Sequence, residues 1–262
     1  NLCHLLRMRG SFAEAETLFE SSLALRTKLW DEDHPWVAGT RRDLAGVKMA
    51  LGDYAAAETL CRRALEVHLR HDGKRDKASD LAVLAQILRD TGRLEEAERT
   101  QLCGLDTLRA TFGPDHPNVA HGLCSLARII HATGDYERAD GSYQAALEIQ
   151  ERHLPANHPE TGVMLTWRGL LFLDRDRPAQ AEPLLRRALE IEKTSFPEGH
   201  WQVVGAEIAL ARTVGALHSV EELRNLRIDE SGLRLGDIAT VVQEVPALTS
   251  GRFLNGEPAV AF

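Results

Sequence analysis

A set of residues that recurs about every 40 positions constrains the fold of this chain more than any other feature. Glycine recurs at Gly10, Gly52, Gly92 and Gly134, and Asp176 holds the next position of the series. A small residue followed by an acidic one recurs at Ala15-Glu16, Ala57-Glu58, Ala97-Glu98, Ala139-Asp140 and Ala181-Glu182. A small residue followed by leucine recurs at Ser22-Leu23, Ala64-Leu65, Gly104-Leu105, Ala146-Leu147 and Ala188-Leu189. Independent markers in one register indicate a true repeat, and this period with two helical segments per unit predicts an α-solenoid.

The segment from Gly134 to Pro159 shows how one unit is built. One stripe of a 3.6-residue helix collects Tyr136, Ala139, Tyr143, Ala146 and Leu147. The mixture of large and small side chains suits close packing between helices. A single helix cannot bury this stripe, so each unit needs neighbours of the same design. The same pattern places Gln150 on the exposed side of the helix.

The repeat markers divide the chain into helices separated by short turns. We expect helices at 12–29, 35–51, 54–70, 77–91, 94–111, 117–133, 136–153, 159–174, 178–194 and 201–212. His-Pro precedes or opens three of them, at His34-Pro35, His116-Pro117 and His158-Pro159, and the corresponding positions elsewhere read Lys74-Arg75 and His200-Trp201. Proline is favoured at the first helical position because its missing N–H costs nothing there. The histidines fall on successive loops, which predicts helix capping and not a metal site.

The motifs resemble tetratricopeptide repeats of the kinesin-light-chain type over residues 1–211. Leu44-Ala45, Gly52-Asp53-Tyr54, Leu126-Ala127 and Gly134-Asp135-Tyr136 carry the resemblance, together with Arg62–Glu66 and Arg186–Glu190. It implies an all-α fold, an α-solenoid of antiparallel helix pairs with about five repeats plus one helix. Leu2-Cys3 occupies the position of Leu44-Ala45, so we expect the first helix to lack its opening turns. The resemblance specifies a scaffold and not a single function.

Residues 212–262 lose the helical period and form a second predicted region, a small mixed α/β tail. A short helix is expected at 219–226, and the apolar, β-branched run 238–245 reads as a strand. Arg252–Leu254 and 259–262 flank Asn255-Gly256, the preferred two-residue hairpin turn.

The tail is similar to the periplasmic porter region of resistance-nodulation-division (RND) efflux transporters. The similarity rests on 234–241, reading RLGDIATV, and on 254–260, reading LNGEPAV. The family's proton-relay residues lie in membrane helices that have no counterpart in this sequence, so no transport role passes to any residue. We expect the join with the repeats between Leu210 and Ala216. A real fusion, an assembly artefact and a misread frame all fit the sequence.

Composition narrows the function classes. The net charge of −8 and the pI near 5.8 argue against a nucleic-acid partner. No run of 18 apolar residues occurs, so no membrane span is expected. Cys3, Cys61, Cys103 and Cys124 form no CxxC motif, and we expect buried thiols in a reduced protein. The repeat region therefore predicts a cytoplasmic location, whereas the family of the tail is periplasmic or inner-membrane.

No motif for catalysis is present. The sequence contains no GxxxxGK[ST], GxGxxG, HExxH or GxSxG pattern, so we expect no enzyme, no cofactor and no metal. Glu58, Glu98 and Glu182 lie near helix starts, where a negative charge is favoured by the helix dipole.

The resemblance implies a binding groove on the inner face of the first helix of each repeat. Transferred by register, the candidate groove residues are Arg42, Asp43, Gln86, Arg89, Ser125, Arg128, His131, Thr166 and Trp167. Light-chain repeats often carry paired Asn just before Leu-Ala, and the four corresponding pairs here are Arg42-Asp43, Ala82-Val83, Cys124-Ser125 and Thr166-Trp167. This departure argues against recognition of the same ligands.

Two alternatives stay open for this face. Arg42, Arg89 and Arg128 would form a basic stripe for an acidic peptide, or the face is solvated and they form local salt bridges to Asp43 and Asp90. Trp167 is either a platform for a ligand or part of the core. The sequence thus predicts a non-enzymatic scaffold for a protein or peptide partner. The alternative is a truncated or chimeric fragment of an RND transporter without transport activity.

Overall fold

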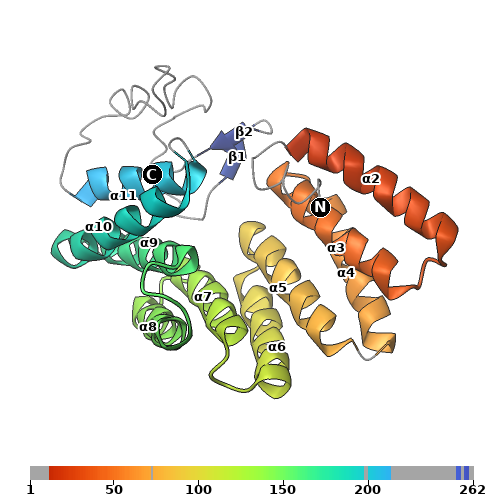
Figure 1. Cartoon of the computed structure of the whole chain (residues 1–262), viewed down its shortest axis with the longest axis horizontal. Helices are drawn as coiled ribbons and strands as arrows, with labels where there is room; N and C mark the ends of the chain where they lie inside the picture. The colour runs from red at the N-terminus through yellow and green to blue at the C-terminus, as the bar shows by residue number, and fades with distance from the viewer. Residues whose placement is uncertain (1–11, 72, 198–199, 214–251, 255–256, 260–262) are drawn as a thin grey trace. The chain divides into compact units, whose positions relative to one another are not determined.

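The computed structural model describes residues 12–71, 73–197, 200–213, 252–254 and 257–259 (Figure 1). The chain divides into two compact units, Asn1–Pro114 and Asp115–Phe262. This division falls inside the repeats. Each unit is built from antiparallel helix pairs, in which the first helix of a repeat is called A and the second B.

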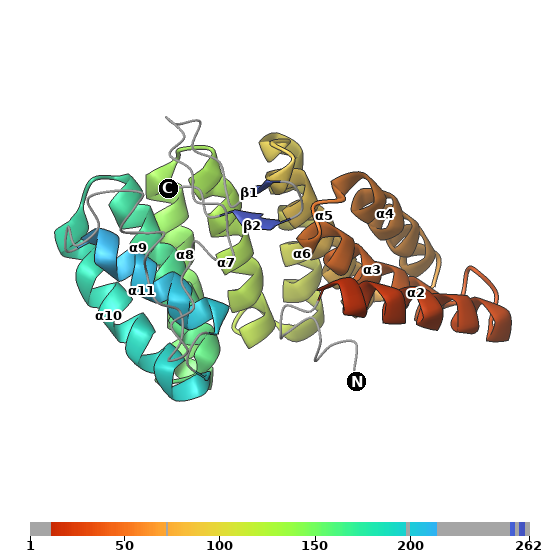
Figure 2. The ribbon, with the colours of Figure 1, turned by 90° about the horizontal axis from the view of Figure 1, so that it is seen from above.

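The first unit is a stack of five described helices (Figures 1 and 2). They are α2 (Phe12–Leu29), α3 (Pro35–Ala50), α4 (Tyr54–Arg70), α5 (Lys74–Asp90) and α6 (Leu94–Phe112). α3 packs against α4 and α5 against α6, while α2 covers α3 and α4 covers α5. Within this unit, α3, α4 and α5 each contact both the other helix of their repeat and a neighbouring repeat, as in a solenoid.

The second unit repeats this arrangement. It contains α7 (Pro117–Ala132), α8 (Tyr136–His153), α9 (Pro159–Asp174), α10 (Pro178–Ser195) and α11 (Trp201–Thr213). α7 pairs with α8 and α9 with α10, and α11 packs against both α9 and α10. The A helices are α3, α5, α7, α9 and α11, and the B helices are α2, α4, α6, α8 and α10. The predicted α-solenoid of helix pairs is confirmed.

The small residues of the repeat allow the helices to approach closely. Ala15, Ala57, Ala97, Ala139 and Ala181, one from each B helix, are all 0% exposed. Large side chains of neighbouring helices fill the space around them, and Tyr143 is fully buried as the stripe of α8 predicts. Alternation of large and small side chains gives the dense packing that stabilises each repeat against the next.

The turns between A and B helices use the predicted glycines. Gly52, Gly92 and Gly134 have φ of 82°, 80° and 83°, a backbone conformation that glycine adopts without strain. Asp176 holds this position in the last repeat with φ of 55°. Aspartate tolerates the left-handed region better than most residues, so the turn is kept.

The histidines at the repeat boundaries cap the A helices. Nδ1 of His34, His116 and His158 accepts the backbone N–H two residues later, at 3.2, 3.1 and 3.3 Å. Proline at the first helical position follows each of them. The capping prediction is confirmed for these three, and Nδ1 of His200 lies 3.4 Å from the N–H of Gln202.

Three predictions need correction. α5 begins at Lys74 and not at 77, because Gly73 serves as the N-cap and Asp76 stands in the first turn, where its charge is favoured. Gln150 is not exposed: it is 0% exposed, and its Nε2 donates to Oε2 of Glu160 on α9 at 2.9 Å. The next repeat covers this side of α8. Cys61 and Cys124 are buried as expected, but Cys103 is exposed on α6.

Two short strands lie near the C-terminus. β1 (Arg252–Leu254) pairs antiparallel with β2 (Glu257–Ala259), with Leu254 opposite Glu257. The second strand begins at Glu257, two residues before the predicted 259. In the observed register, Glu257 already pairs with Leu254. The helix and strand predicted at 219–226 and 238–245 lie outside the described residues. Among the helices that the structure describes, none is long and apolar enough to cross a membrane.

Candidate functional site

In the first unit, Arg42 lies within a cluster of carboxylates. Its guanidinium is 3.5 Å from Asp43, 3.2 Å from Asp76 and 3.6 Å from Asp80. Burial lowers the pKa of Arg42, but the surrounding carboxylates outweigh it and raise the pKa above its ordinary value. Most of its charge is therefore satisfied within α3 and α5.

Arg89 is buried on α5, and its charge is likewise paired. The residue is 7% exposed, and its guanidinium Nη2 lies 2.7 Å from Oδ1 of Asp90. Gln86, one turn earlier on the same helix, is half-buried. Arg42 and Arg89 thus form the local salt bridges that were the alternative to a basic binding stripe.

In the second unit, an arginine lies on the face of a tryptophan. The guanidinium carbon of Arg128 on α7 is 3.8 Å from the ring centroid of Trp167 on α9. Both side chains are half-buried, and Ser125, one turn before Arg128, is buried beside them along α7. Cation–π contact and stacking hold the guanidinium in one orientation.

A second polar cluster follows along the same A helices. Nε2 of His131 lies 3.0 Å from Oδ2 of Asp174 on α9, and Oδ1 of Asp174 is 3.6 Å from Arg212 on α11. The His131 ring also packs edge-on against Tyr136 at 5.6 Å. Asp174 therefore joins three A helices of this unit through side-chain contacts.

Thr166 faces the B helix instead. Its hydroxyl donates to Oε1 of Glu192 at 3.2 Å, and Glu192 is 1% exposed. Burial raises the pKa of this carboxyl to about 7, while the hydrogen bond from Thr166 acts in the opposite direction and lowers the pKa. The pair lies inside the α9–α10 interface, so Thr166 contributes to packing more than to a surface.

The predicted groove residues therefore fall into two groups. Arg42, Asp43, Gln86 and Arg89 belong to the first unit, and Ser125, Arg128, His131, Thr166 and Trp167 to the second. The structure brings Arg128 together with Trp167 and adds Asp174 and Arg212, which the sequence reasoning missed. Trp167 and Asp174 are two helical turns apart on α9, so extending the A-helix face along its whole length would have found Asp174.

The described residues give no sign of a catalytic or metal centre. No group of three His, Cys, Asp or Glu side chains within them could hold a metal ion. The polar contacts described above are arginine and histidine contacts with carboxylates, within and between helices, and the hydrogen bond of Thr166 to Glu192.

Antiparallel helix pairs stacked in register define an α-solenoid, a class of repeat protein whose A-helix faces form extended surfaces. The sequence model of the tetratricopeptide repeat matches residues 1–70, 37–101, 77–152 and 122–194. The chain belongs to the tetratricopeptide repeat family. Proteins of this family typically serve as interaction scaffolds. No curated protein matches the sequence.

Solved structures show the same fold in light-chain-like proteins. BtubC (BKLC) from P. vanneervenii matches with a TM-score of 0.63 and 22% identity, over 78% of this chain and 84% of that one. A putative kinesin light chain from Podosopora anserina with nearly identical TPR-like repeats matches with a TM-score of 0.58 and 20% identity, over 74% and 92%. These matches confirm the predicted repeat fold, which the chain shares with light-chain-like proteins.

Two Rap proteins also share the fold. The Rap conjugation gene regulator of plasmid pLS20, solved with the Phr* peptide, gives a TM-score of 0.70 at 12% identity. The match covers 84% of this chain and 58% of that regulator. A Rap protein complexed with Competence and Sporulation Factor gives 0.66 at 15% identity, over 86% and 64%. At such low sequence identity, these matches establish a shared fold and nothing further.

Proposed function

We propose that this chain is a non-enzymatic scaffold that binds a peptide or partner segment on the A-helix face of α7 and α9. The stacked pair Arg128–Trp167 is the recognition centre, and it takes an acidic side chain or a terminal carboxylate. The single observation that carries the proposal is the 3.8 Å stacking of the guanidinium on the indole ring.

The chemistry of this pair supports a carboxylate ligand. A planar guanidinium presents its N–H groups in a fork that matches the two oxygens of a carboxylate. Stacking on Trp167 restricts the rotamers of Arg128 before any ligand arrives, which lowers the entropic cost of binding. The indole ring adds apolar surface beside the cation, so the site suits a mixed acidic and apolar sequence.

The other arginines of the predicted stripe have a smaller role in this proposal. Arg42 contacts three carboxylates and Arg89 is buried against Asp90, so neither adds much positive charge to the surface. Recognition is assigned to the second unit because the stacking of Arg128 on Trp167 lies there. The Rap structures, solved with a peptide or with Competence and Sporulation Factor, support a peptide as ligand for this fold, because they share its architecture.

Peptide selection followed by titration tests the proposal. An array of random 12-residue peptides is screened against the full chain, and the tightest binder is labelled for fluorescence anisotropy. We expect the selected peptides to be rich in Asp and Glu. Arg128→Ala and Trp167→Ala should each weaken binding about tenfold or more, the effect of losing more than 1.4 kcal/mol of interaction. Arg186→Ala, an exposed arginine on the B helix α10, is the matched control and should leave affinity unchanged.

Equal affinity of Arg128→Ala and wild type for the best peptide would reject this site. Enrichment of basic peptides in the selection would reject the acidic ligand while leaving the scaffold function open.

The alternative, a fragment of an RND transporter without transport activity, is a proposal for residues 212–262. The hairpin strands β1 and β2 support it, because the tail motif LNGEPAV spans them. It implies domains at 1–211 and 212–262. Reading the genomic sequence for one continuous frame across Arg212 tests it, and a frame break there would reject a real fusion.

A further inference from the structure

A hollow of about 810 Å³ lies on the B-helix side of the first unit, between α4, α5 and α6. It is lined by Leu69 at the end of α4, by Lys74 and Lys77 at the start of α5, and by one face of α6. That face consists of Arg99, Leu102, Cys103, Asp106, Thr107 and Ala110. These positions alternate in steps of three and one, so they form a single stripe about 16 Å long. The stripe differs from the buried face of α6, which carries Ala97, Gln101 and Leu105.

Small residues at three repeat positions create this hollow. In the preceding repeat, Asp33 before α3 forms ion pairs with Arg63 and Arg70 of α4, both at 2.8 Å. The repeat from Gly52 to Gly92 is 40 residues long. One repeat later, the positions of Asp33, Arg63 and Arg70 are therefore held by Gly73, Cys103 and Ala110. The charged cluster that covers α4 in one repeat is therefore absent from α6 in the next.

The same loop position keeps its charge in the second unit. Asp115 stands one repeat after Gly73 and contacts both Arg152 and His153 of α8. The repeat formed by α5 and α6 lacks both this acidic residue and the His-Pro pair.

Among the described residues that line the hollow, cations outnumber carboxylates. The structure records no ion pair for Lys74, Lys77 or Arg99 among the residues it describes, and the one lining carboxylate, Asp106, lies 3.5 Å from Arg109. Elsewhere between α4 and α6, by contrast, the arginines form ion pairs. Arg62 pairs with Glu96, and Arg93 pairs with Glu58. On a chain of net charge −8, this excess of cations favours an acidic partner.

The floor of the hollow is apolar. Leu69 is 55% exposed and Leu102 is 39% exposed, among the few large apolar side chains of the described chain that face solvent. A groove between two helices with an apolar floor is the surface on which a third, amphipathic helix packs. Cations on the rim would then face acidic residues that flank the apolar stripe of that helix.

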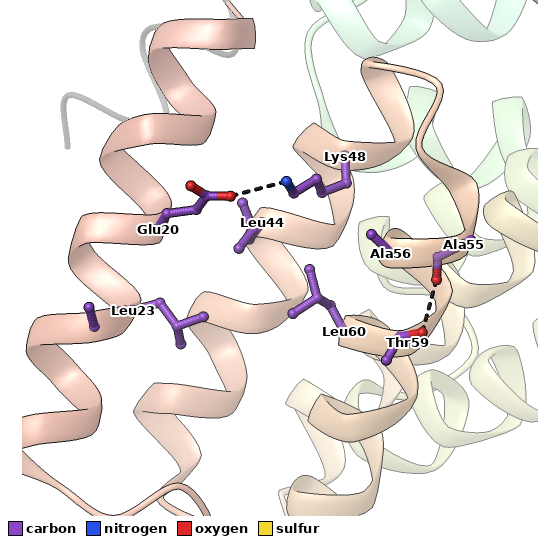
Figure 3. A pocket seen from close by; sticks show the side chains of 9 residues that line it. Glu20, Leu23, Leu44, Lys48, Ala55, Ala56, Thr59 and Leu60 are labelled. Atoms are coloured by element: carbon purple, nitrogen blue, oxygen red, sulfur yellow. Dashed lines mark hydrogen bonds and ion pairs between the residues drawn. The ribbon is translucent and has the colours of Figure 1, made fainter.

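A second hollow in the same unit does not support a docking proposal. It lies between α2, α3 and α4, with a volume of about 620 Å³, and Leu23, Leu44 and Leu60 point into it (Figure 3). Its lysine, Lys48, is bound by Glu16 and Glu20. With its charge satisfied, nothing there defines the chemistry of an occupant.

We propose that the hollow between α4, α5 and α6 docks an acidic amphipathic helix of a partner protein. This surface is independent of the Arg128–Trp167 site and lies in the other unit. Leucines of the partner helix occupy the floor at Leu69 and Leu102, and its Asp or Glu residues face Lys74, Lys77 and Arg99.

Cysteine footprinting gives a direct readout, because Cys103 lies in the hollow while Cys61 and Cys124 are buried. Cys3 lies outside the described residues and is replaced by serine in every protein used. The probe is a helical peptide of about 16 residues, roughly four turns, with Leu on one stripe and Glu beside it. At ten times its Kd, this peptide should slow alkylation of Cys103 by N-ethylmaleimide about tenfold. A scrambled peptide of the same composition should not protect.

Two sets of variants separate docking from general electrostatics. Lys74→Glu, Lys77→Glu and Arg99→Glu together should abolish protection, whereas Lys28→Glu, Arg152→Glu and Arg186→Glu, with the same change of net charge, should preserve it. Gly73→Asp, Cys103→Arg and Ala110→Arg together rebuild the ion-paired cluster of the preceding repeat and fill the hollow. A Cβ at Gly73 would meet nothing closer than 3.7 Å, so this variant should fold. It should lose binding of the labelled peptide in an anisotropy titration, with an unchanged helical circular-dichroism spectrum.

Each opposing outcome overturns the proposal. A peptide with Lys in place of Glu that protects equally well would remove the charge argument. Absence of protection by the acidic peptide at millimolar concentration would show that the hollow docks no such helix. Protection that increases with protein concentration alone would identify a second copy as the occupant. Protection only by phosphatidylglycerol vesicles would identify a membrane surface.

Discussion

At the scale of single residues, a buried histidine joins three helices of the first unit. Nδ1 of His68 on α4 lies 2.6 Å from Oδ2 of Asp80 on α5, and Nε2 lies 3.2 Å from the carbonyl of Pro35 on α3. The carbonyl can only accept, so Nε2 carries a hydrogen, and Nδ1 and Asp80 share a second proton. Burial lowers the pKa of His68, but the hydrogen bond to Asp80 outweighs it, so the net shift is upward.

His68 therefore makes the stability of the protein depend on pH. Its contribution is fully present below the unfolded pKa near 6.5 and is lost as pH rises through the higher folded pKa. In urea titrations between pH 6 and pH 9, the free energy of unfolding should fall with pH in the wild type and fall less in His68→Gln. His71→Gln, at an exposed residue beside it, is the control and should keep the wild-type slope. Identical slopes in all three proteins would contradict the shared proton.

A buried carboxyl in the second unit gives a related prediction. Burial raises the pKa of Glu192 from 4.5 to about 7, so its contribution to stability is present below pH 4.5 and is lost as pH rises through about 7. Glu192→Gln should therefore raise the free energy of unfolding at pH 8 by on the order of 2 kcal/mol and leave it nearly unchanged at pH 4. Glu190→Gln, at an exposed position of the same helix, should have no effect at either pH. Destabilisation by Glu192→Gln at pH 8 would show that the charged form is the native one.

At the scale of elements, one B-helix position recurs as a buried polar contact. His68, Gln150 and Glu192 hold it in three repeats, and they contact Asp80, Glu160 and Thr166 of A helices. The sequence predicts the helices themselves well, because the glycines, alanines and His-Pro pairs agree in one register. The burial of Gln150 was not predicted, because glutamine is usually exposed and its burial here depends on a partner from the next repeat. The candidate site was only partly predictable for the same reason. Register transfer found Arg128 and Trp167, but their stacking depends on how α7 lies against α9.

Two glycines of the second unit test how tightly these elements pack. A Cβ on Gly169 of α9 would lie 2.6 Å from Cδ2 of Leu185 on α10, whereas one on exposed Gly141 of α8 would meet nothing within 4 Å. Gly169→Ala should therefore destabilise the protein by about 1–3 kcal/mol through overpacking. Gly141→Ala should stabilise it by about 0.5–1 kcal/mol through helix propensity. Thermal unfolding of the two variants measures both effects, and a stabilised Gly169→Ala would contradict the close approach of α9 and α10.

At the scale of the whole molecule, the two units carry different surfaces. The second unit carries the arginine–tryptophan pair on its A helices, and the first carries the cation-rimmed hollow on its B-helix side. Solenoid stability is mainly a sum of contacts between neighbouring repeats, so substitutions at one surface should leave the other folded. Under the two proposals, the two surfaces would take separate partners, with the repeats as the support for both.

The central claim, peptide binding at Arg128–Trp167, is tested most directly by fluorine NMR of the full chain. The protein contains four tryptophans, Trp30, Trp36, Trp167 and Trp201, and labelling with 5-fluorotryptophan gives each its own signal. Trp→Phe variants assign the four signals. On titration with the selected acidic peptide, the Trp167 signal should shift in proportion to the bound fraction, while those of Trp30 and Trp36 should stay in place. A saturating peptide that leaves the Trp167 signal unmoved would contradict the account.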